Sequence, residues 1–318
     1  MSLDAVVLVG LAGLFAVVSG VNDGGALLAT GLKLPTVRPV RGMLALVLLV
    51  AVVPLITHQV AVTFVTRLGS YHQPGGRIAM TIAVISALVV VGVLSAKGRP
   101  TSLTLAIVGG LAGAGTGWGL PVSPGSVALV LAFGLAAPLA GGLLAWVLVR
   151  VLVAVTTARG LSGWHRAGFL LQGFAYAAND GQKMLAVFMI AFGVPDAMPA
   201  YTSAAAVLFG LGTLYGLPRA GRTLGRELIA SRPQHGVAAE LSASVAAIAC
   251  ASVGMPVSMT QAIAGGLIGA GVAQSTGRVR WYATGRIVLA WLLTLPAGAL
   301  LGWALALLVK GLVGMGPV

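Results

Sequence analysis

The sequence has very few charged residues for its length. Of its 318 residues only 8% are Asp, Glu, Lys or Arg, whereas 58% are hydrophobic and the mean hydropathy is +1.02. An ordinary soluble domain has about 25% charged and about 45–50% apolar residues. The composition therefore excludes a soluble globular domain and indicates a chain that is embedded in a membrane.

Cysteine and acidic residues are also scarce, which limits the chemistry available. The single cysteine, Cys250, excludes an internal disulfide and a metal site built from several cysteines. The six carboxylates are Asp4, Asp23, Asp180, Asp196, Glu227 and Glu240. They are too few for two-metal chemistry, and the sequence has no His-rich motif and no nucleophile and base at a recognisable spacing. We therefore expect no cofactor and no enzymatic activity; a membrane-embedded enzyme acting on a lipid phosphate, or a channel, stays open as a less favoured alternative.

Long apolar runs occupy most of the chain. A hydrocarbon core of about 30 Å needs about 20 helical residues to cross it. Runs of this kind cover residues 4–34, 42–66, 78–96, 123–157, 167–194, 200–217, 236–254 and 285–312. Shorter glycine-rich stretches at residues 101–117 and 257–273 are expected to be the return arms of helical hairpins. The predicted fold class is an all-α polytopic membrane protein.

The two halves of the chain carry the same motifs. Asn22-Asp23-Gly24 returns as Asn179-Asp180-Gly181, and Pro100-Thr101-Ser102-Leu103-Thr104 returns as Pro256-Val257-Ser258-Met259-Thr260. Residues 99–115 and 255–271 are identical at 11 of 17 aligned positions. Paired polar interruptions at matching places in two halves of a membrane chain indicate the binding site of a transporter.

The basic residues indicate the topology. The net charge is +13, and 13 of the 19 basic residues lie in residues 33–41, 150–166, 219–232 and 278–286. Short cytoplasmic loops carry such an excess, so we place these segments on the cytoplasmic side and expect no nucleic-acid partner. Both chain termini are then extracytoplasmic.

This topology predicts two inverted repeats, each with three crossings, a re-entrant helical hairpin and a broken helix. The first repeat is expected at residues 1–157, with its hairpin near 78–117. A linker at 158–166 leads to the second repeat at 167–318, with its hairpin near 236–274.

The two Asn-Asp-Gly motifs predict a cation site. A carboxylate inside an apolar stretch costs at least about 2.5–3.5 kcal/mol and indicates function. Gly frees the backbone while Asn and Asp compete for its hydrogen bonds, so the helix should be interrupted there. Free carbonyl groups and hard side-chain oxygens suit Na⁺ or a proton. The predicted cation ligands, with Na⁺ at the two aspartates, are Asp23, Asp180, Asn22 and Asn179.

The Pro-x-Ser-x-Thr motifs supply binding groups for an anion. Pro is favoured at a helix start, where free amides and the positive end of the dipole attract negative charge. The predicted substrate ligands are Ser102, Thr104, Ser258 and Thr260, followed by Asn22, Asn179 and Gln182. The accessory residues are Lys183, Arg99, Glu240 and Thr30. Lys183 and Arg99 either neutralise the anion or instead snorkel or pair with carboxylates.

At these motifs the chain resembles the inorganic phosphate transporter family of secondary carriers. Each half of that family has a Gly-Ala-Asn-Asp type motif and a Pro-Val-Ser-Thr-Thr-His type motif. The second half is the closer match: Ala178-Asn179-Asp180-Gly181-Gln182-Lys183 resembles the bacterial form, and Ala239-Glu240 and Gly254-Met255-Pro256-Val257-Ser258 follow. The resemblance implies two re-entrant hairpins, phosphate between hairpin hydroxyls and motif amides, and cations at the motif Asp and Asn residues.

The resemblance also predicts an activity. We expect cation-coupled symport of inorganic phosphate by alternating access, in the plasma membrane (the bacterial inner membrane), with Na⁺ or H⁺ as the coupling cation. The partners are phosphate, that cation and the lipid bilayer, and a homodimer is a further option.

The chain also departs from the family pattern. Ala26 stands where the family often has a second Asn, Leu103 and Met259 replace the middle Thr, and Leu105 and Gln261 replace the His. Because these side-chain ligands are lost, sulfate, which is isosteric with phosphate, stays open as the transported oxyanion.

Overall fold

The computed structural model of the chain describes residues 3–31, 34–71, 73, 75–96, 101–192, 198–222 and 232–314. These residues are almost entirely helical, with a single antiparallel bridge between Gly69 and Val122 among them. Seven of the described helices are long and apolar enough to cross a membrane. The predicted all-α polytopic class is therefore confirmed.

The first half consists of a long helix, a helix with a break, a hairpin and a second long helix. Their bounds are α1 Leu3–Ser19, η1 Gly20–Gly24, α2 Gly25–Gly31, α3 Pro39–Ile56, α4 Gln59–Val62, η2 Thr63–Arg67, α5 Gly76–Ala96, α6 Leu103–Trp118 and α7 Pro124–Val155.

The second half follows the same order, except that its counterpart of the helix with a break is unbroken. Its elements are α8 Ala158–Tyr176, η3 Ala177–Gly181, α9 Gln182–Phe192, α10 Met198–Arg222, α11 Pro233–Ser252, α12 Met259–Gln274, η6 Thr276–Arg278 and α13 Trp281–Val313. The predicted apolar run at 167–194 is thus shared among α8, η3 and α9. The described part of the chain contains both helical hairpins, formed by α5 with α6 and by α11 with α12.

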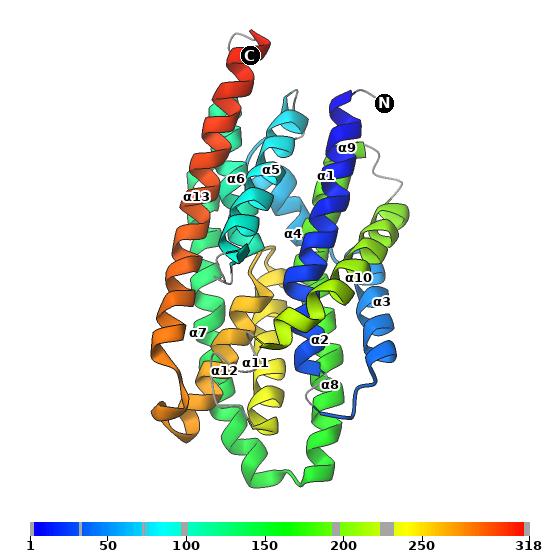
Figure 1. The fold of residues 1–318 in the computed structure, drawn as a ribbon, viewed down its shortest axis with the longest axis vertical. Coiled ribbons are helices and arrows are strands. Elements are labelled where there is room, and N and C mark those ends of the chain that lie inside the picture. Colours follow the sequence, from blue (N-terminus) through cyan, green and yellow to red (C-terminus); the bar gives the residue numbers. More distant parts are fainter. Residues whose placement is uncertain are drawn as a thin grey trace.

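The two hairpins lie toward opposite ends of the molecule (Figure 1). The α5–α6 hairpin lies at the end where α1 begins and α13 ends, and the α11–α12 hairpin lies toward the other end. The connections from α2 to α3, from α7 to α8 and from α12 to α13 also lie at that other end. Three of the four segments that are rich in basic residues are therefore gathered on one side of the protein.

The return helix of each hairpin packs against the long helix of the other half. Gly109 of α6 lies so close to α13 that an added Cβ would overlap the Leu295 carbonyl oxygen. Gly265 of α12 approaches α7 in the same way, against the Pro138 carbonyl oxygen. Only glycine permits this approach of two backbones. The glycines shared by the two repeated segments therefore have an equivalent packing role in both halves.

Each Asn-Asp-Gly motif lies in a π-helical turn within a helix that continues on both sides. In η1 the Gly25 amide bonds to the Gly20 carbonyl oxygen, five residues earlier, and Ser19 and Gly25 on either side have right-handed helical dihedral angles. Tyr176 and Gln182, which flank η3, are also helical. The expected interruption is thus a local widening, because a π-turn accommodates one extra residue without ending the helix. Such turns frequently occur at functional sites.

The outward surfaces of the two long helices are apolar. On α7, Leu139 is 74% exposed and Leu143 is 68% exposed, and on α13 Leu300 is 68% exposed. Water would not favour such surfaces, whereas hydrocarbon chains would. This agrees with a chain whose long helices face lipid.

Candidate functional site

The repeated motifs of the two halves meet in the protein interior. The Thr104 hydroxyl, in the first turn of α6, lies 3.2 Å from the Val257 carbonyl oxygen and 3.4 Å from Asp180 Oδ1. Val257 belongs to the segment just before α12, and Asp180 belongs to η3. One residue of the first hairpin therefore contacts both motifs of the second half.

Asp180 is buried and is paired with Lys183, one turn further along the same helix. Asp180 is 6% exposed and Lys183 is 3% exposed. Lys183 Nζ lies 2.7 Å from Asp180 Oδ1, 2.6 Å from Thr104 Oγ1 and 2.6 Å from the Val257 carbonyl oxygen. An ammonium group has three hydrogens, so these three acceptors use all of them. Of the two sequence alternatives, the structure has Lys183 paired with a carboxylate.

Asp23, in η1, has different partners. Its Oδ1 accepts a hydrogen bond of 2.9 Å from the Asn22 side-chain amide, and its carboxylate also contacts the Thr260 hydroxyl of the second hairpin. Thr260 Oγ1 is in turn 2.9 Å from Ser258 Oγ. Asp23 is 4% exposed and is close enough to Asp180 and Lys183 to interact with them electrostatically. The two predicted cation-binding carboxylates therefore belong to one buried cluster.

Two of the predicted ligands, Asn179 and Gln182, form hydrogen bonds with other parts of the chain. The Asn179 side chain donates to the Met255 carbonyl oxygen at 3.3 Å and accepts from the Val257 amide at 3.1 Å. Asn179 thereby fixes the segment that leads into α12. The sequence predicted Asn179 as a ligand of both the anion and the cation, and in this structure its amide and its carbonyl oxygen both bind the chain itself.

Both the oxygen and the nitrogen of the Gln182 side-chain amide have two hydrogen-bond partners each. Its Oε1 accepts from the amides of Val60 and Ala61 at 2.8 and 3.1 Å. Its Nε2 donates to Thr57 Oγ1 at 3.0 Å and to the Ala178 carbonyl oxygen at 2.6 Å. These contacts bridge the break between α3 and α4, so Gln182 caps the N-terminus of α4 from another helix. The sequence offered no signal of this role, because the partners lie more than 120 residues away.

Ser102 forms the N-cap of α6, where its Oγ accepts from the Leu105 amide at 3.2 Å. This is the capping role expected of a serine before a helix. At the start of α12 the Met259 amide is directed at the Asp180 carboxylate. The N-terminus of the second hairpin helix therefore faces a carboxylate of the protein itself, whereas the motif predicts a substrate anion there.

Several buried polar atoms in the motif region have no hydrogen-bond partner among the described residues. They are Thr101 Oγ1, Gln261 Oε1, Asp180 Oδ2 and the Tyr176 hydroxyl. Each such atom carries a desolvation penalty of about 1–3 kcal/mol. Tyr176, which was not among the predicted ligands, immediately precedes η3 and interacts electrostatically with both aspartates. A ligand that occupied this region would find donors and acceptors not used by the fold.

Glu240 and Thr30, two predicted accessory residues, have partners outside this cluster. Glu240 Oε1 lies 3.5 Å from His165 Nε2, and His165 Nδ1 is 2.5 Å from the Thr36 hydroxyl. Thr30 donates to Gln172 Oε1 at 3.2 Å. His165 and Gln172 are seven residues apart on α8, a spacing that would have revealed a polar face in the sequence. Arg99, the remaining accessory prediction, lies outside the described residues.

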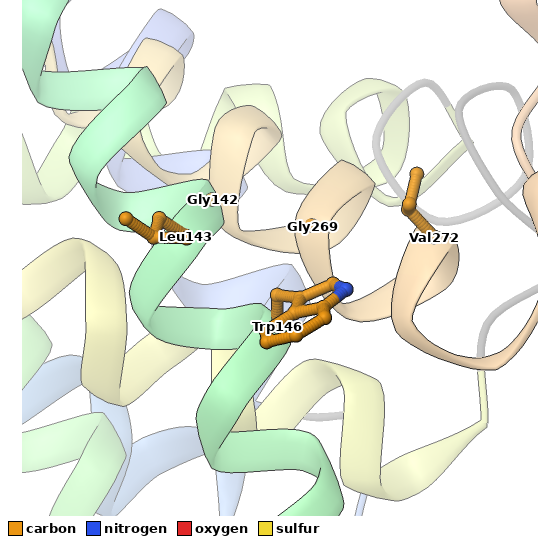
Figure 2. A pocket seen from close by; sticks show the side chains of 5 residues that line it. All are labelled: Gly142, Leu143, Trp146, Gly269 and Val272. Atoms are coloured by element: carbon orange, nitrogen blue, oxygen red, sulfur yellow. The ribbon is translucent and has the colours of Figure 1, made fainter.

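One hollow in the protein is separate from the motif residues (Figure 2). It has a volume of about 320 Å³ and lies between α7 and α12. Its lining residues are Gly142, Leu143, Trp146, Gly269 and Val272. Because this lining is almost wholly apolar and Leu143 is largely exposed, the hollow suits a hydrocarbon surface and not a charged substrate.

Comparison with protein families gives a match in the second half. Residues 167–302 match the family model described as the phosphate transporter family. A protein of Mycobacterium bovis named "probable low-affinity inorganic phosphate transporter" is 34% identical over 224 residues, which are 64% of this chain and 54% of that protein. The chain thus spans about half the length of that relative.

Two further comparisons extend over nearly the whole chain. A Bacillus subtilis protein with the same printed name is 23% identical over 307 residues, covering 91% of this chain and 92% of that protein. A solved structure titled "The sodium-dependent phosphate transporter" superposes with a TM-score of 0.82 at 16% identity, covering 97% of this chain and 99% of that one. This likeness shows the fold. The relatives are named as transporters, in agreement with the expectation that the chain is not an enzyme.

Proposed function

Because the second half of this chain carries a phosphate transporter family domain, we propose that the protein is a multi-pass secondary carrier that moves inorganic phosphate across the membrane together with a cation. The names of its relatives and the fold it shares with a phosphate transporter support this proposal. The proposal includes two inverted repeats, at residues 1–157 and 167–318, which are joined by a linker at 158–166.

The observation that carries the proposal is the meeting of the two hairpin starts with the two Asn-Asp-Gly motifs. Thr104 lies between Val257 and Asp180, and Thr260 lies against Asp23. Groups that suit an anion are thereby adjacent to groups that suit a cation. In such an arrangement a bound cation would favour binding of the anion by charge attraction.

The charges in this cluster favour a coupling cation. When Asp23, Asp180 and Lys183 are all ionised, they carry one net negative charge together before any substrate enters. Charges interact strongly where water is scarce, so an entering phosphate anion would be repelled unless a cation accompanied it. The mobile cation, Na⁺ or H⁺, would enter at Asp23, while the hydroxyls of Ser102, Ser258 and Thr260 and the helix-start amides would hold the phosphate.

The arrangement of the hairpins favours alternating access. They lie toward opposite ends of the molecule (Figure 1), and Thr104 in the first turn of α6 contacts Val257, just before α12. Movement of one hairpin would open the cluster toward one side while the other hairpin kept the opposite side closed. Inverted repeats place equivalent gates on the two sides of one central site in this manner.

The test is transport by the purified protein in sealed lipid vesicles. We expect labelled phosphate to accumulate above its equilibrium level when an inward Na⁺ or H⁺ gradient is imposed, and Asp23→Asn to abolish accumulation while the protein still inserts. Empty vesicles serve as the background, and a parallel series with labelled sulfate establishes which oxyanion is carried. Folded protein that accumulates neither oxyanion under any gradient would overturn the proposal.

A further inference from the structure

The two Asn-Asp-Gly motifs differ three residues after the aspartate. Lys183 follows Asp180, and the equivalent residue after Asp23 is Ala26. Both positions are buried, with Ala26 2% exposed and Lys183 3% exposed. One motif thus places a basic side chain on the same helix as its carboxylate, and the other motif does not.

The surroundings of the Lys183 ammonium resemble the coordination shell of a metal cation. Its three acceptors are a carboxylate oxygen of Asp180, a hydroxyl oxygen of Thr104 and the backbone carbonyl oxygen of Val257. Hard oxygen atoms of these kinds are the ligands that proteins use for small hard cations. They come from three separate motifs and lie 2.6–2.7 Å from the nitrogen. Ca²⁺, which is close in size to Na⁺, binds oxygen at about 2.3–2.6 Å.

We propose that the Lys183 ammonium is a tethered cation that occupies the place of one mobile coupling cation in the Asp180 half of the site. This inference rests on the proposed function, since a coupling cation has a meaning only in a cation-coupled carrier. Asp23 then binds the mobile cation, and Asp180 does not exchange its cation during the transport cycle.

A contact between Lys183 and the transported anion is disfavoured by the same geometry. The three hydrogens of the ammonium group already have acceptors within 2.7 Å. An anion would have to displace Asp180, Thr104 or Val257 to reach it. The ammonium therefore acts on the anion through its charge and holds the two hairpins together at the cluster.

The experiment measures cation binding directly, with no phosphate present. Purified full-length protein is unfolded by heat while NaCl replaces choline chloride at constant ionic strength. Asp23→Asn removes the proposed mobile site, and a second substitution then isolates the Asp180 site. Lys183→Ala removes the charge and leaves room for an ion, whereas Lys183→Met removes the charge and keeps the space filled.

Ligand binding to the folded state raises the unfolding temperature as the ligand concentration increases beyond its dissociation constant. We expect Asp23→Asn with Lys183→Ala to gain Na⁺-dependent stabilisation, of about 3 °C for each tenfold increase in Na⁺ at saturating concentrations. The matched variant Asp23→Asn with Lys183→Met should gain none. A merely structural role for Lys183 predicts no gain in either variant, and that result would overturn the inference.

The single variant Asp23→Asn provides an independent measurement if the double variants do not fold. With Lys183 intact, it should show no Na⁺-dependent stabilisation. If it keeps stabilisation that requires Asp180, a mobile ion binds beside Lys183 and the inference is wrong. Since phosphate is absent from these measurements, failure of phosphate transport would appear only in the vesicle assay and would be recognised separately.

Discussion

Substitution of Gln182 by leucine separates its structural role from the substrate contact that the sequence suggests. Leucine has a similar volume but cannot accept hydrogen bonds, so the buried amides of Val60 and Ala61 would lose their acceptor. Each buried unpaired amide costs about 1–3 kcal/mol, so the two together should cost about 2–6 kcal/mol. Since Gln182 also bridges to Thr57, the break between α3 and α4 should loosen.

For a chain of this length one kcal/mol lowers the unfolding temperature by about 2 °C, so Gln182→Leu should lower it by about 4–12 °C. The matched control, Thr57→Val, removes one partner of the Gln182 side chain and should cost about 1 kcal/mol. Thermal unfolding of the purified protein gives the stability, and vesicle uptake at varied phosphate gives the apparent phosphate constant. Unchanged stability with a constant raised tenfold or more would refute the structural assignment and restore Gln182 as a substrate ligand.

Three other perturbations test the anion site, the helix packing and the topology. Ser258→Ala should raise the apparent phosphate constant about tenfold to hundredfold in vesicle uptake, because a hydrogen bond to a charged group contributes about 1.5–3 kcal/mol; an unchanged constant would exclude this hydroxyl. Gly265→Ala should sharply reduce the yield of monodisperse protein, since its Cβ would overlap backbone of α7, whereas Gly125→Ala, whose Cβ meets nothing within 4 Å, should not; equal yields would contradict the close packing. Single cysteines at the exposed positions Gln73 and Ala158, in a cysteine-free background, should react with an impermeant thiol reagent from opposite faces of the membrane, Ala158 from the cytoplasm; reaction of both from one face would contradict the topology.

The sequence predicted helical hairpins and a shared interior position for the repeated motifs. Polar residues that recur at matching places in two apolar halves have few alternatives to a shared interior, because each alone in the hydrocarbon region would be costly. The contact of Thr104 with Val257, across the two halves, agrees with that reasoning. The glycines of the repeated segments likewise indicated close helix packing, because small residues let two helix backbones approach each other.

The partners of the amide side chains could not be predicted in the same way. Asn and Gln each carry a donor and an acceptor, so the sequence does not distinguish a ligand from a residue that caps another helix. Asn179 binds the segment before α12, and Gln182 binds the start of α4. Both choices depend on which backbone groups the fold leaves unpaired at a distance in the chain. The sequence also does not predict the form of the helix interruption, because Asn-Asp-Gly permits both a break and a π-turn.

The two repeated motifs differ chemically, and this difference has a consequence for the proposed transport cycle. A carrier must return without its substrate, and in that state the charges of the cluster have no mobile partner. Two uncompensated carboxylates would be costly in an interior that excludes water, and they would repel each other. In the proposed cycle Lys183 would compensate Asp180 in every state, because it is attached to the same helix and lies 2.7 Å from Asp180 in this structure. Asp23, with Asn22 and Thr260 as its partners, is then the group whose cation must be released and rebound. Under the proposed function, the difference between Lys183 and Ala26 would place the exchangeable cation in the first half and the permanent charge in the second.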